Sequence, residues 1–380
     1  MQASESVGSL FFEDIMESNL QITFKNNTQS DIYIDNDFFN LPVLIKEKYD
    51  YSKKILVVTD SNVEKLYLQE VKNLLTSENT TVFDFVIEAG EESKNLTNVN
   101  SCYNALIENS FAKSDIIVAL GGGVVTDLAG FVASTYKRGI VLINVPTTLL
   151  AMCDAGIGGK CGVDYNDVKN SIGSVYLPQI VYMASKTLLS LDDRNYSSGI
   201  AEVLKAGLIK DGPFYEWMIN NFGEIMDKDM SFVKEMIFKA VSIKQFFVTK
   251  DPFDTAERRM LNFGHTIGHA LEEYFNFKYS HGECVCLGSI AASYIAYKRQ
   301  MLSMEEFYEI RDMFVPFNLP ISLDEFDTQK VYSIIGNDKK IDKNGLNFVL
   351  LKKIGKAVIV NDVTKEELLE AINSLIVKWD

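Results

Sequence analysis

The sequence predicts two domains of different class, an α/β domain with a parallel sheet followed by a mainly α-helical domain. Three observations lead to this expectation. Short apolar runs alternate with helical stretches from residue 54 to about residue 186, as in parallel strands joined by crossover helices. Long amphipathic stretches then dominate from Arg194 to about Gly336. A chain of 380 residues is also long enough for two domains.

The expected strands of the first half are short apolar runs. KILVVTD, residues 54–60, is typical of a strand buried on both faces, and residues 63–75 are expected to form its crossover helix. Further elements are expected as strands at 20–24, 31–35, 80–87, 115–120, 140–145 and 179–183, and as a helix near 96–108. We therefore place a Rossmann-like domain at residues 19–186 and the helical domain at residues 187–380, after an acidic, loosely ordered extension at residues 1–18.

The last part of the chain is expected to return to β structure. A polar loop, NDKKIDKNG at residues 337–345, precedes two short apolar runs at 347–351 and 357–360. These runs predict a β pair, and the pattern that begins at Thr364 predicts a final helix.

The composition limits the partners and the compartment. With 47% hydrophobic and 23% charged residues it is ordinary for a globular protein, and a net charge of −15 argues against nucleic acid and an anionic membrane as partners. No apolar run reaches the length of a membrane span, and the first basic residue is Lys25, so we expect no signal peptide and cytoplasmic residence. Five cysteines without a CxxC pair favour a reducing compartment and no disulfides.

A glycine turn, GGGVVTDLAG, directly follows the expected strand at 115–120. Glycines between a strand and a helix let the backbone approach a ligand closely, and the helix N-terminus offers N–H groups to a pyrophosphate. A plain tight turn would use the same residues, and the motif is not GxGxxG. Its place at the carboxyl end of a strand favours a dinucleotide site, and Thr147 and Thr148 follow the next strand in the same way.

The segment at residues 151–173 combines five glycines with Asp154, Lys160, Lys169 and Asn170. The glycine content predicts a structured loop and argues against a regular helix. The lysines could be solvated surface residues, but beside an acid and an amide they could also form an anion-binding site.

All three histidines of the chain, His265, His269 and His281, fall within one short stretch. His265 and His269 are four residues apart, on one face of a probable helix, where they could be metal ligands or hydrogen-bonded core residues. The clustering favours a metal site, and the spacing points to His265 with His269. Cys284 and Cys286 follow closely and could be ligands, but their apolar surroundings favour core packing.

Another ionisable pair, Glu202 and Lys205, lies three residues apart on an expected apolar helix. A carboxylate in such a helix needs a partner, and a metal ion would serve. Lys244 and Arg258 fall on further expected helices.

Taken together, these motifs resemble those of the 3-dehydroquinate synthases, which catalyse the second step of the shikimate pathway. The matching segments are GGGVVTDLAGFVASTYKRG, VPTTLL, GGKCGV with KNSIG, SGIAEVLKAG, NFGHTIGHALE and HGE, in the family's order and across roughly residues 54–340. The resemblance implies an NAD-binding domain, a helical metal-binding domain and an active site between them. It also implies a homodimer.

The resemblance assigns zinc or cobalt to Glu202, His265 and His281, in place of the pair indicated by spacing alone. His269 would lie near the substrate, for hydrogen bonding and proton transfer. Two nitrogens and one carboxylate leave open positions on the metal, which substrate hydroxyls can occupy.

The resemblance also implies the binding residues of the two organic ligands. NAD would be held by residues of the first domain, namely Asp60, Asn62, Glu91, Lys94, Gly122, Gly123, Asp127, Thr147, Thr148, Lys160 and Lys169. A sugar acid phosphate, whose carboxylate and phosphate attract cations, would contact Arg138, Asp154, Lys160, Lys169, Asn170, Lys205, Lys244, Arg258, Asn262, His269 and one of Lys339 and Lys340. The catalytic roles would fall to Lys160, Asp154, Lys205, Lys244, Arg258, Asn262 and His269.

The implied reaction converts 3-deoxy-D-arabino-heptulosonate 7-phosphate to 3-dehydroquinate and phosphate. NAD+ oxidises the hydroxyl at carbon 5, phosphate leaves by β-elimination, and the hydride then returns. Ring opening and an intramolecular aldol step close the carbocycle, so that NAD is recycled.

The sequence departs from the family pattern at three points. Cys161 stands where threonine is usual, Asp164 stands where asparagine is common, and VDYNDVKN lacks the usual His or Gly before Lys-Asn. The alternatives are another sugar-phosphate cyclase, a metal-dependent polyol dehydrogenase with the same GGGxxxD turn, and an inactive binding protein. Arg258, Asn262 and His269 keep the dehydroquinate pattern, and none of the expected ionisable catalytic residues is missing.

Overall fold

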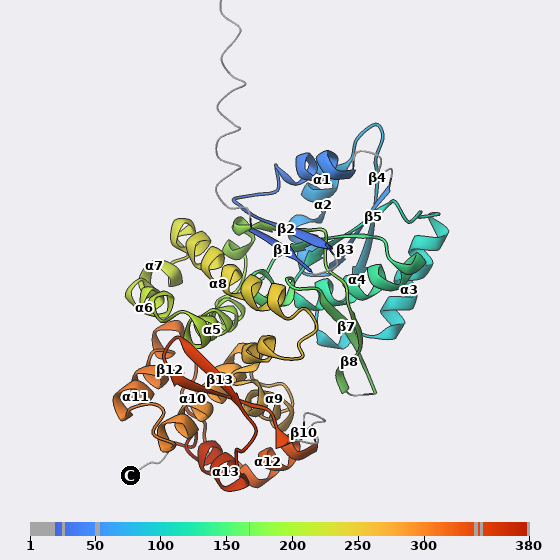
Figure 1. The fold of residues 1–380 in the computed structure, drawn as a ribbon. Coiled ribbons are helices and arrows are strands. Elements are labelled where there is room, and N and C mark those ends of the chain that lie inside the picture. The colour runs from blue at the N-terminus through green and yellow to red at the C-terminus, as the bar shows by residue number, and fades with distance from the viewer. Residues whose placement is uncertain are drawn as a thin grey trace, which may run out of the picture. The chain divides into compact units, whose positions relative to one another are not determined.

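The computed structural model describes residues 20–24, 27–49, 54–166, 168–337, 341–342 and 345–377. It divides into two compact units, one ending at Leu189 and the other starting at Ser190. Each unit is described by itself below (Figure 1).

The first unit is built on a seven-stranded sheet. All neighbouring strands pair in parallel except at the edge, where β1 (Leu20–Thr23) runs antiparallel to β2 (Gln29–Asp35). The sheet order after β1 and β2 is β9 (Ile180–Ala184), β6 (Val141–Pro146), β5 (Ile116–Gly121), β3 (Lys54–Asp60) and β4 (Thr81–Ile87). Each of the seven predicted strands is therefore confirmed to within about two residues.

Helices cover both faces of this sheet, which is why its central strands are apolar throughout. Leu56 and Val58 of β3 face the core under α3 (Leu96–Glu108) and α4 (Gly123–Thr135). Ile55 and Val57 face the opposite core, under α1 (Leu41–Tyr49) and α2 (Gln69–Leu75). The predicted helix at 63–75 is present, with a π-helical first part, η1 (Glu64–Leu68).

The prediction of a loop at residues 151–173 was wrong. A short π-helix, η4 (Ala151–Ala155), is followed by a hairpin of β7 (Lys160–Tyr165) and β8 (Val168–Val175). The glycines allow close approach here and do not break the structure. A Cβ atom on Gly162 would lie 2.6 Å from the carbonyl oxygen of Ile172 on the partner strand, and one on Gly173 would meet Cys161.

The second unit is mainly helical, as predicted. Its central helix, α10 (His281–Lys298), contacts α5 (Asp193–Lys210), α9 (His265–Tyr274), α11 (Met304–Asp312), α13 (Lys365–Asn373) and β12 (Phe348–Lys353). Cys284 and Cys286 are fully buried in α10, as predicted for core residues, and all five cysteines are free thiols. Further elements are α6 (Gly212–Asn220), α7 (Phe222–Met226), α8 (Met230–Lys250), η6 (Glu257–Asn262), η7 (Val315–Phe317), α12 (Thr328–Asn337) and β13 (Lys356–Val360), which pairs with β12.

The C-terminal β pair and the last helix are confirmed, and Thr364 caps α13. Two short strands, β10 (Ile341–Asp342) and β11 (Gly345–Leu346), lie within the predicted polar loop. Lys339 and Lys340 lie outside the described residues.

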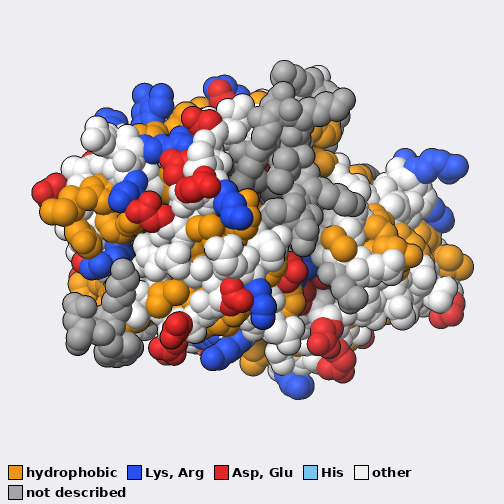
Figure 2. Space-filling model, turned by 90° about the horizontal axis from the view of Figure 1, so that it is seen from below, with side chains coloured by type: hydrophobic (Ala, Val, Ile, Leu, Met, Phe, Trp, Pro, Cys, Tyr) orange, Lys and Arg blue, Asp and Glu red, His pale blue; other side chains and the backbone are white. Residues whose placement is uncertain are grey.

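Charged side chains of both signs are interspersed over the face shown in Figure 2, so the net charge is not gathered into one patch on that face. Among the described helices, none is both long enough and apolar enough to span a membrane.

An ion pair between α10 and α13 predicts a specific acid sensitivity. Arg299 donates to Glu367 through Nε (2.6 Å) and Nη2 (2.8 Å), and this pairing holds the pKa of Glu367 at about 2, below its ordinary 4.5. Because the folded-state pKa is the lower one, the stabilisation is complete above pH 4.5 and is lost as the pH falls towards 2. We expect Glu367→Gln, which can keep the capping box, to cost about 1 kcal/mol at pH 7 and much less at pH 2, where about half of Glu367 is protonated.

Urea unfolding between pH 2 and pH 7 tests this prediction. Glu366→Gln is the control, because Glu366 is an exposed neighbour on the same helix. A pH-independent difference between wild type and Glu367→Gln would contradict it.

Candidate metal centre and cofactor site

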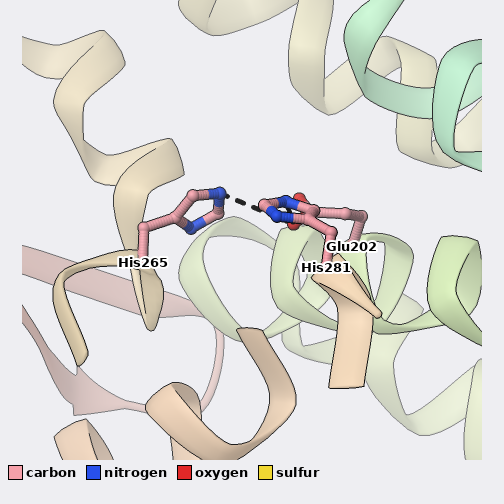
Figure 3. Close-up of side chains that lie close together, drawn as sticks. All are labelled: Glu202, His265 and His281. Carbon is pink, nitrogen blue, oxygen red and sulfur yellow. Dashed lines mark ion pairs between the residues drawn. The ribbon is translucent and has the colours of Figure 1, made fainter. Parts of the chain in front are cut away.

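Three side chains from three helices converge in the second unit. Glu202 lies in the buried middle of α5, whereas His265 and His281 are the first residues of α9 and α10. The Nε2 atoms of both histidines face one carboxylate oxygen, Oε1 of Glu202, at 3.6 Å for His265 and 3.3 Å for His281 (Figure 3). Two ligand atoms on one tetrahedral zinc ion lie about 3.4 Å apart, so the three residues fit a metal ion.

The starts of α9 and α10 are determined locally. Gly264 precedes His265 with φ of 79°, and a Cβ atom there would lie 2.7 Å from the carbonyl oxygen of Val285. Ser280 caps α10 and forms a capping box with Glu283. These two signals place both histidines at helix starts, where their side chains can reach α5.

The electrostatics of the cluster also suit a cation. Glu202 is 3% exposed; its Oε1 faces the Nε2 atoms of the two histidines, and its Oε2 pairs with Lys205. Burial alone would raise the pKa of Glu202, but Lys205 and the two histidines hold it well below its usual range. Burial, followed by Lys205, lowers the pKa of His265 to about 3, so this imidazole is neutral. Burial lowers the pKa of His281, but Glu202 and Glu272 outweigh it and raise that pKa to about 10, so metal binding there would release a proton. The ionised carboxylate of Glu202 and the neutral imidazole of His265 are ready metal ligands.

His269 lies on the same helix as His265 but does not reach Glu202 in the same way. Its ring centroid is 5.2 Å from that of His265 and 5.9 Å from that of His281. It belongs to a second group of possible ligands, with Glu272 and His281. The structure thus brings His281 to Glu202 where the spacing argument had pointed to His269.

The remaining predicted residues of the second unit are largely buried. Lys205 on α5, Lys244 on α8 and Arg258 on η6 are each less than 9% exposed, and these three elements contact one another. Arg258 donates from Nη1 to the carbonyl oxygen of Pro252 at 2.7 Å. Asn262, the half-buried last residue of η6, immediately precedes the segment that leads to His265. Buried cations on α5 and on two elements packed against it suit an anionic ligand.

In the first unit, the glycine turn lies at the carboxyl end of the sheet. Gly122 caps α4, and a Cβ atom on it would lie 3.1 Å from Cγ2 of Thr148, while one on Gly123 would lie 3.3 Å from Ala155. The hydroxyl of Thr147 is buried and has no hydrogen-bond partner within the described ranges. Gly121 pairs with Pro146 on the neighbouring strand, so the turn and both threonines share one edge. An orphaned hydroxyl beside a glycine-lined helix N-terminus fits a dinucleotide.

Asp60 and Asn62 lie at the end of the adjacent strand β3. Asp60 accepts hydrogen bonds from the backbone N–H groups of Asn62 (2.9 Å) and Val63 (3.1 Å). Because β3 pairs in parallel with β5, this turn lies at the same edge as the glycine turn.

Lys94 lies close to two more of the predicted cofactor residues and to one of the departures from the family pattern. Its ammonium group is 2.6 Å from Glu91, 3.5 Å from Asp127 and 3.9 Å from Asp164. Burial raises the pKa of Asp127 to about 7, although Lys94 opposes the shift. Asp164 also accepts a hydrogen bond from the backbone N–H of Asn170 at 2.7 Å. Asp164 therefore links β8 to the group formed by Lys94, Glu91 and Asp127, which we call the Lys94 cluster.

A second departure, Cys161, is a packing residue. Its side chain is buried, its Sγ is 3.2 Å from Oγ of Ser174, and a Cβ atom on Gly130 would lie 2.8 Å from its own Cβ. The predicted anion-binding residues near it differ in exposure. Asp154 is half-buried, whereas Arg138, Lys160, Lys169 and Asn170 are exposed.

The sequence reasoning missed Glu272. It is 5% exposed, and its Oε1 is 3.3 Å from Nδ1 of His281. The available signal was its position on α9, seven residues after His265 and three after His269, which puts all three on one helix face. Glu273 follows directly, and the sequence does not show which of the two glutamates is buried.

Comparison with known proteins gives consistent relatives. The family model described as 3-dehydroquinate synthase N-terminal matches residues 84–198, and the one described as 3-dehydroquinate synthase C-terminal matches residues 199–341. The chain is 38% identical over 346 residues to the 3-dehydroquinate synthase of Ruminiclostridium cellulolyticum, covering 90% of this chain and 96% of that one. It is 40% identical over 318 residues to the enzyme of the same name from Clostridium kluyveri, covering 83% and 88%.

Solved structures with the same fold include other cyclases. The 2-epi-5-epi-valiolone synthase of Streptomyces hygroscopicus, with NAD+ and Zn2+ bound, is 27% identical, with a TM-score of 0.83 over 91% of this chain and 96% of that one. A 2-deoxy-scyllo-inosose synthase with NAD+ and Co2+ has a TM-score of 0.85 over 94% and 100%, at 24% identity, which shows the fold alone.

Proposed function

Because the chain belongs to the 3-dehydroquinate synthase family, we propose that it converts 3-deoxy-D-arabino-heptulosonate 7-phosphate to 3-dehydroquinate and phosphate. This is the work of a phosphate-eliminating carbon–oxygen lyase in the shikimate pathway. The observation that carries the proposal is the convergence of Glu202, His265 and His281 in a chain that is 38% identical to a named synthase over 90% of its length.

The cofactors are NAD and a divalent metal, Zn2+ or Co2+, as in the cyclase structures of the same fold. When bound, NAD supplies the hydride acceptor and donor, and the metal polarises substrate oxygens. Glu202, His265 and His281 hold the metal. The NAD residues are those of the sheet edge and the Lys94 cluster, namely Asp60, Asn62, Glu91, Lys94, Gly122, Gly123, Asp127, Thr147 and Thr148, with Lys160 and Lys169.

The chain's own side chains bind the substrate and move protons. His269, half-buried beside both metal-binding histidines, is placed to hydrogen-bond a reacting hydroxyl and accept its proton. Buried Lys205, Lys244 and Arg258, with Asn262, bind the anionic groups of the substrate and stabilise the departing phosphate. Arg138, Asp154, Lys160, Lys169 and Asn170 bind substrate from the first unit, and one of Lys339 and Lys340 completes the set.

Lys160→Ala tests the substrate role of the first unit. Lys160 is the exposed first residue of β7, so its removal should leave the fold intact. We expect kcat to fall by roughly a hundredfold, about 3 kcal/mol, as for loss of one donor that stabilises developing charge. Steady-state kinetics on the purified variant measure this, and unchanged kinetics would remove Lys160 from the assignment. Lys137→Ala, an exposed lysine outside the proposed set, is the control.

Two substitutions of Asp164 form a second test. They distinguish the effect of its charge from the effect of its hydrogen bond with Asn170. Asp164→Asn keeps an oxygen that accepts from the N–H of Asn170, so we expect kcat/KM within roughly threefold of wild type. Asp164→Ala removes the acceptor, and we expect about a tenfold loss. Equal kinetics for the two variants would show that this hydrogen bond does not position the site.

An assay with catalytic NAD+ and metal-loaded protein tests the function itself. We expect phosphate and 3-dehydroquinate in equal amounts, with no accumulation of NADH. Stoichiometric NADH would identify a polyol dehydrogenase, and phosphate release only from a neutral sugar phosphate would identify another cyclase. If metal-loaded protein turned over none of these substrates, the result would support the alternative of an inactive binding protein.

We also infer that the protein is cytoplasmic, as expected from the sequence, and acts as a homodimer, as the family resemblance implies. Light scattering after size-exclusion chromatography should give twice the chain mass of 42.8 kDa.

A further inference from the structure

We propose that Glu272 is a positioning residue for the metal centre, holding His281 in the tautomer and orientation that present Nε2 to the metal. The inference rests on the proposed function, because it concerns the metal site assigned there. Glu272 is not one of the three proposed metal ligands, but it contacts one of them, His281.

The imidazole of His281 lies between two carboxylates. Its Nε2 is 3.3 Å from Oε1 of Glu202, and its Nδ1 is 3.3 Å from Oε1 of Glu272. With a metal ion between Glu202, His265 and His281, the imidazole would be neutral and its one N–H would be on Nδ1, where Glu272 is the acceptor. If Nδ1–H donates to Glu272, the lone pair of Nε2 is left to face the side on which Glu202 and His265 converge.

His265 shows the same arrangement with a different acceptor. Its Nδ1 is 3.1 Å from the carbonyl oxygen of Phe263, which can only accept a hydrogen bond, and its Nε2 faces Glu202. Both histidines are thus oriented through Nδ1 by an oxygen outside the convergence point. The two glutamates therefore have different roles. Glu202 faces the Nε2 atoms of both histidines, as a metal ligand would, whereas Glu272 contacts Nδ1 of His281.

Close packing of two helices brings Glu272 to His281. Glu272 lies on α9 and His281 begins α10, and a Cβ atom on Gly268 of α9 would lie 2.8 Å from the carbonyl oxygen of Cys284 of α10. Glu272 is 5% exposed, and a carboxylate at such a position is costly unless it is hydrogen-bonded. Its neighbour Glu273 is exposed. The buried glutamate is therefore the one in contact with the histidine.

Two conservative variants separate position from charge. Glu272→Gln keeps a carbonyl oxygen at the same reach, whereas Glu272→Asp keeps the charge but is one methylene shorter. Glu273→Asp is the matched control. The readouts are the Kd for Co2+ by chelator competition, the visible absorption spectrum of the bound Co2+, and the unfolding midpoint of the metal-free protein.

We expect Glu272→Asp to weaken Co2+ binding by about ten- to a hundredfold and to change the visible spectrum. Glu272→Gln should stay within roughly fivefold of wild type, and Glu273→Asp should be unchanged. Equal Co2+ affinity in Glu272→Asp and wild type would overturn the inference. So would two Co2+ ions per wild-type chain with only one in Glu272→Asp, because Glu272 would then be a ligand.

The same experiments distinguish failure of the proposed metal centre from failure of the role proposed for Glu272. If wild-type protein binds no Co2+, the metal centre itself is wrong, and the inference falls with it. If wild type binds one Co2+ and loses it in Glu202→Gln, but all Glu272 variants bind normally, only the inference fails.

Discussion

Replacing His265 by alanine is expected to remove tightly bound metal and to lower turnover by at least about a thousandfold. The reason is that Nε2 of His265 is one of only two imidazole nitrogens that the described residues direct at Oε1 of Glu202. Polarisation by a metal ion is worth several kcal/mol, and about 1.4 kcal/mol corresponds to a tenfold change in rate. Metal content by mass spectrometry and kcat with added Zn2+ or Co2+ measure the two effects.

His269→Ala is the matched control, because it removes the neighbouring histidine on the same helix. We expect this variant to keep its metal and to lose turnover, since the proposed role of His269 is proton transfer. Metal retained by His265→Ala and lost by His269→Ala would instead support the ligand pair that helical spacing alone indicates.

Lys205→Met is expected to destabilise the metal-free protein by about 3–5 kcal/mol, the usual cost of removing one partner from a buried ion pair. Lys205 is 2% exposed and pairs with Oε2 of Glu202, which is also buried. Without Lys205, the pKa of Glu202 should rise, because burial opposes its charge and the cation that offsets this is gone. We expect added Zn2+ to restore part of the lost stability, since a cation beside Glu202 replaces the missing charge.

Urea unfolding with and without Zn2+ tests this prediction. Lys210→Met is the control, because Lys210 is an exposed lysine at the end of the same helix, and its loss should cost less than about 1 kcal/mol. A loss of similar size in both variants would show that the ion pair with Glu202 is not the cause.

Local patterns in the sequence predicted most of the fold. KILVVTD is apolar on both faces because the sheet is covered on both faces, so its hydrophobic run alone identified β3 as a buried parallel strand. The amphipathic stretches likewise identified the helices of the second unit. The loop expected at residues 151–173 was wrong because glycine has two uses, to break regular structure and to let two strands approach, and composition does not distinguish them.

The sequence by itself determined the seven strands of the main sheet, most of the helices, the glycine turn at a strand end and the clustering of three histidines. These features depend on residues close together in the chain, so hydrophobic periodicity and spacing reveal them. Helical spacing pointed to His269, the family resemblance indicated His281, and the tertiary structure shows that His281 faces Glu202 beside His265. The tertiary structure alone decided that Glu272, and not Glu273, contacts His281. Those choices depend on how α5, α9 and α10 pack, and the packing of one helix on another leaves no periodic signal that identifies the contacting pair.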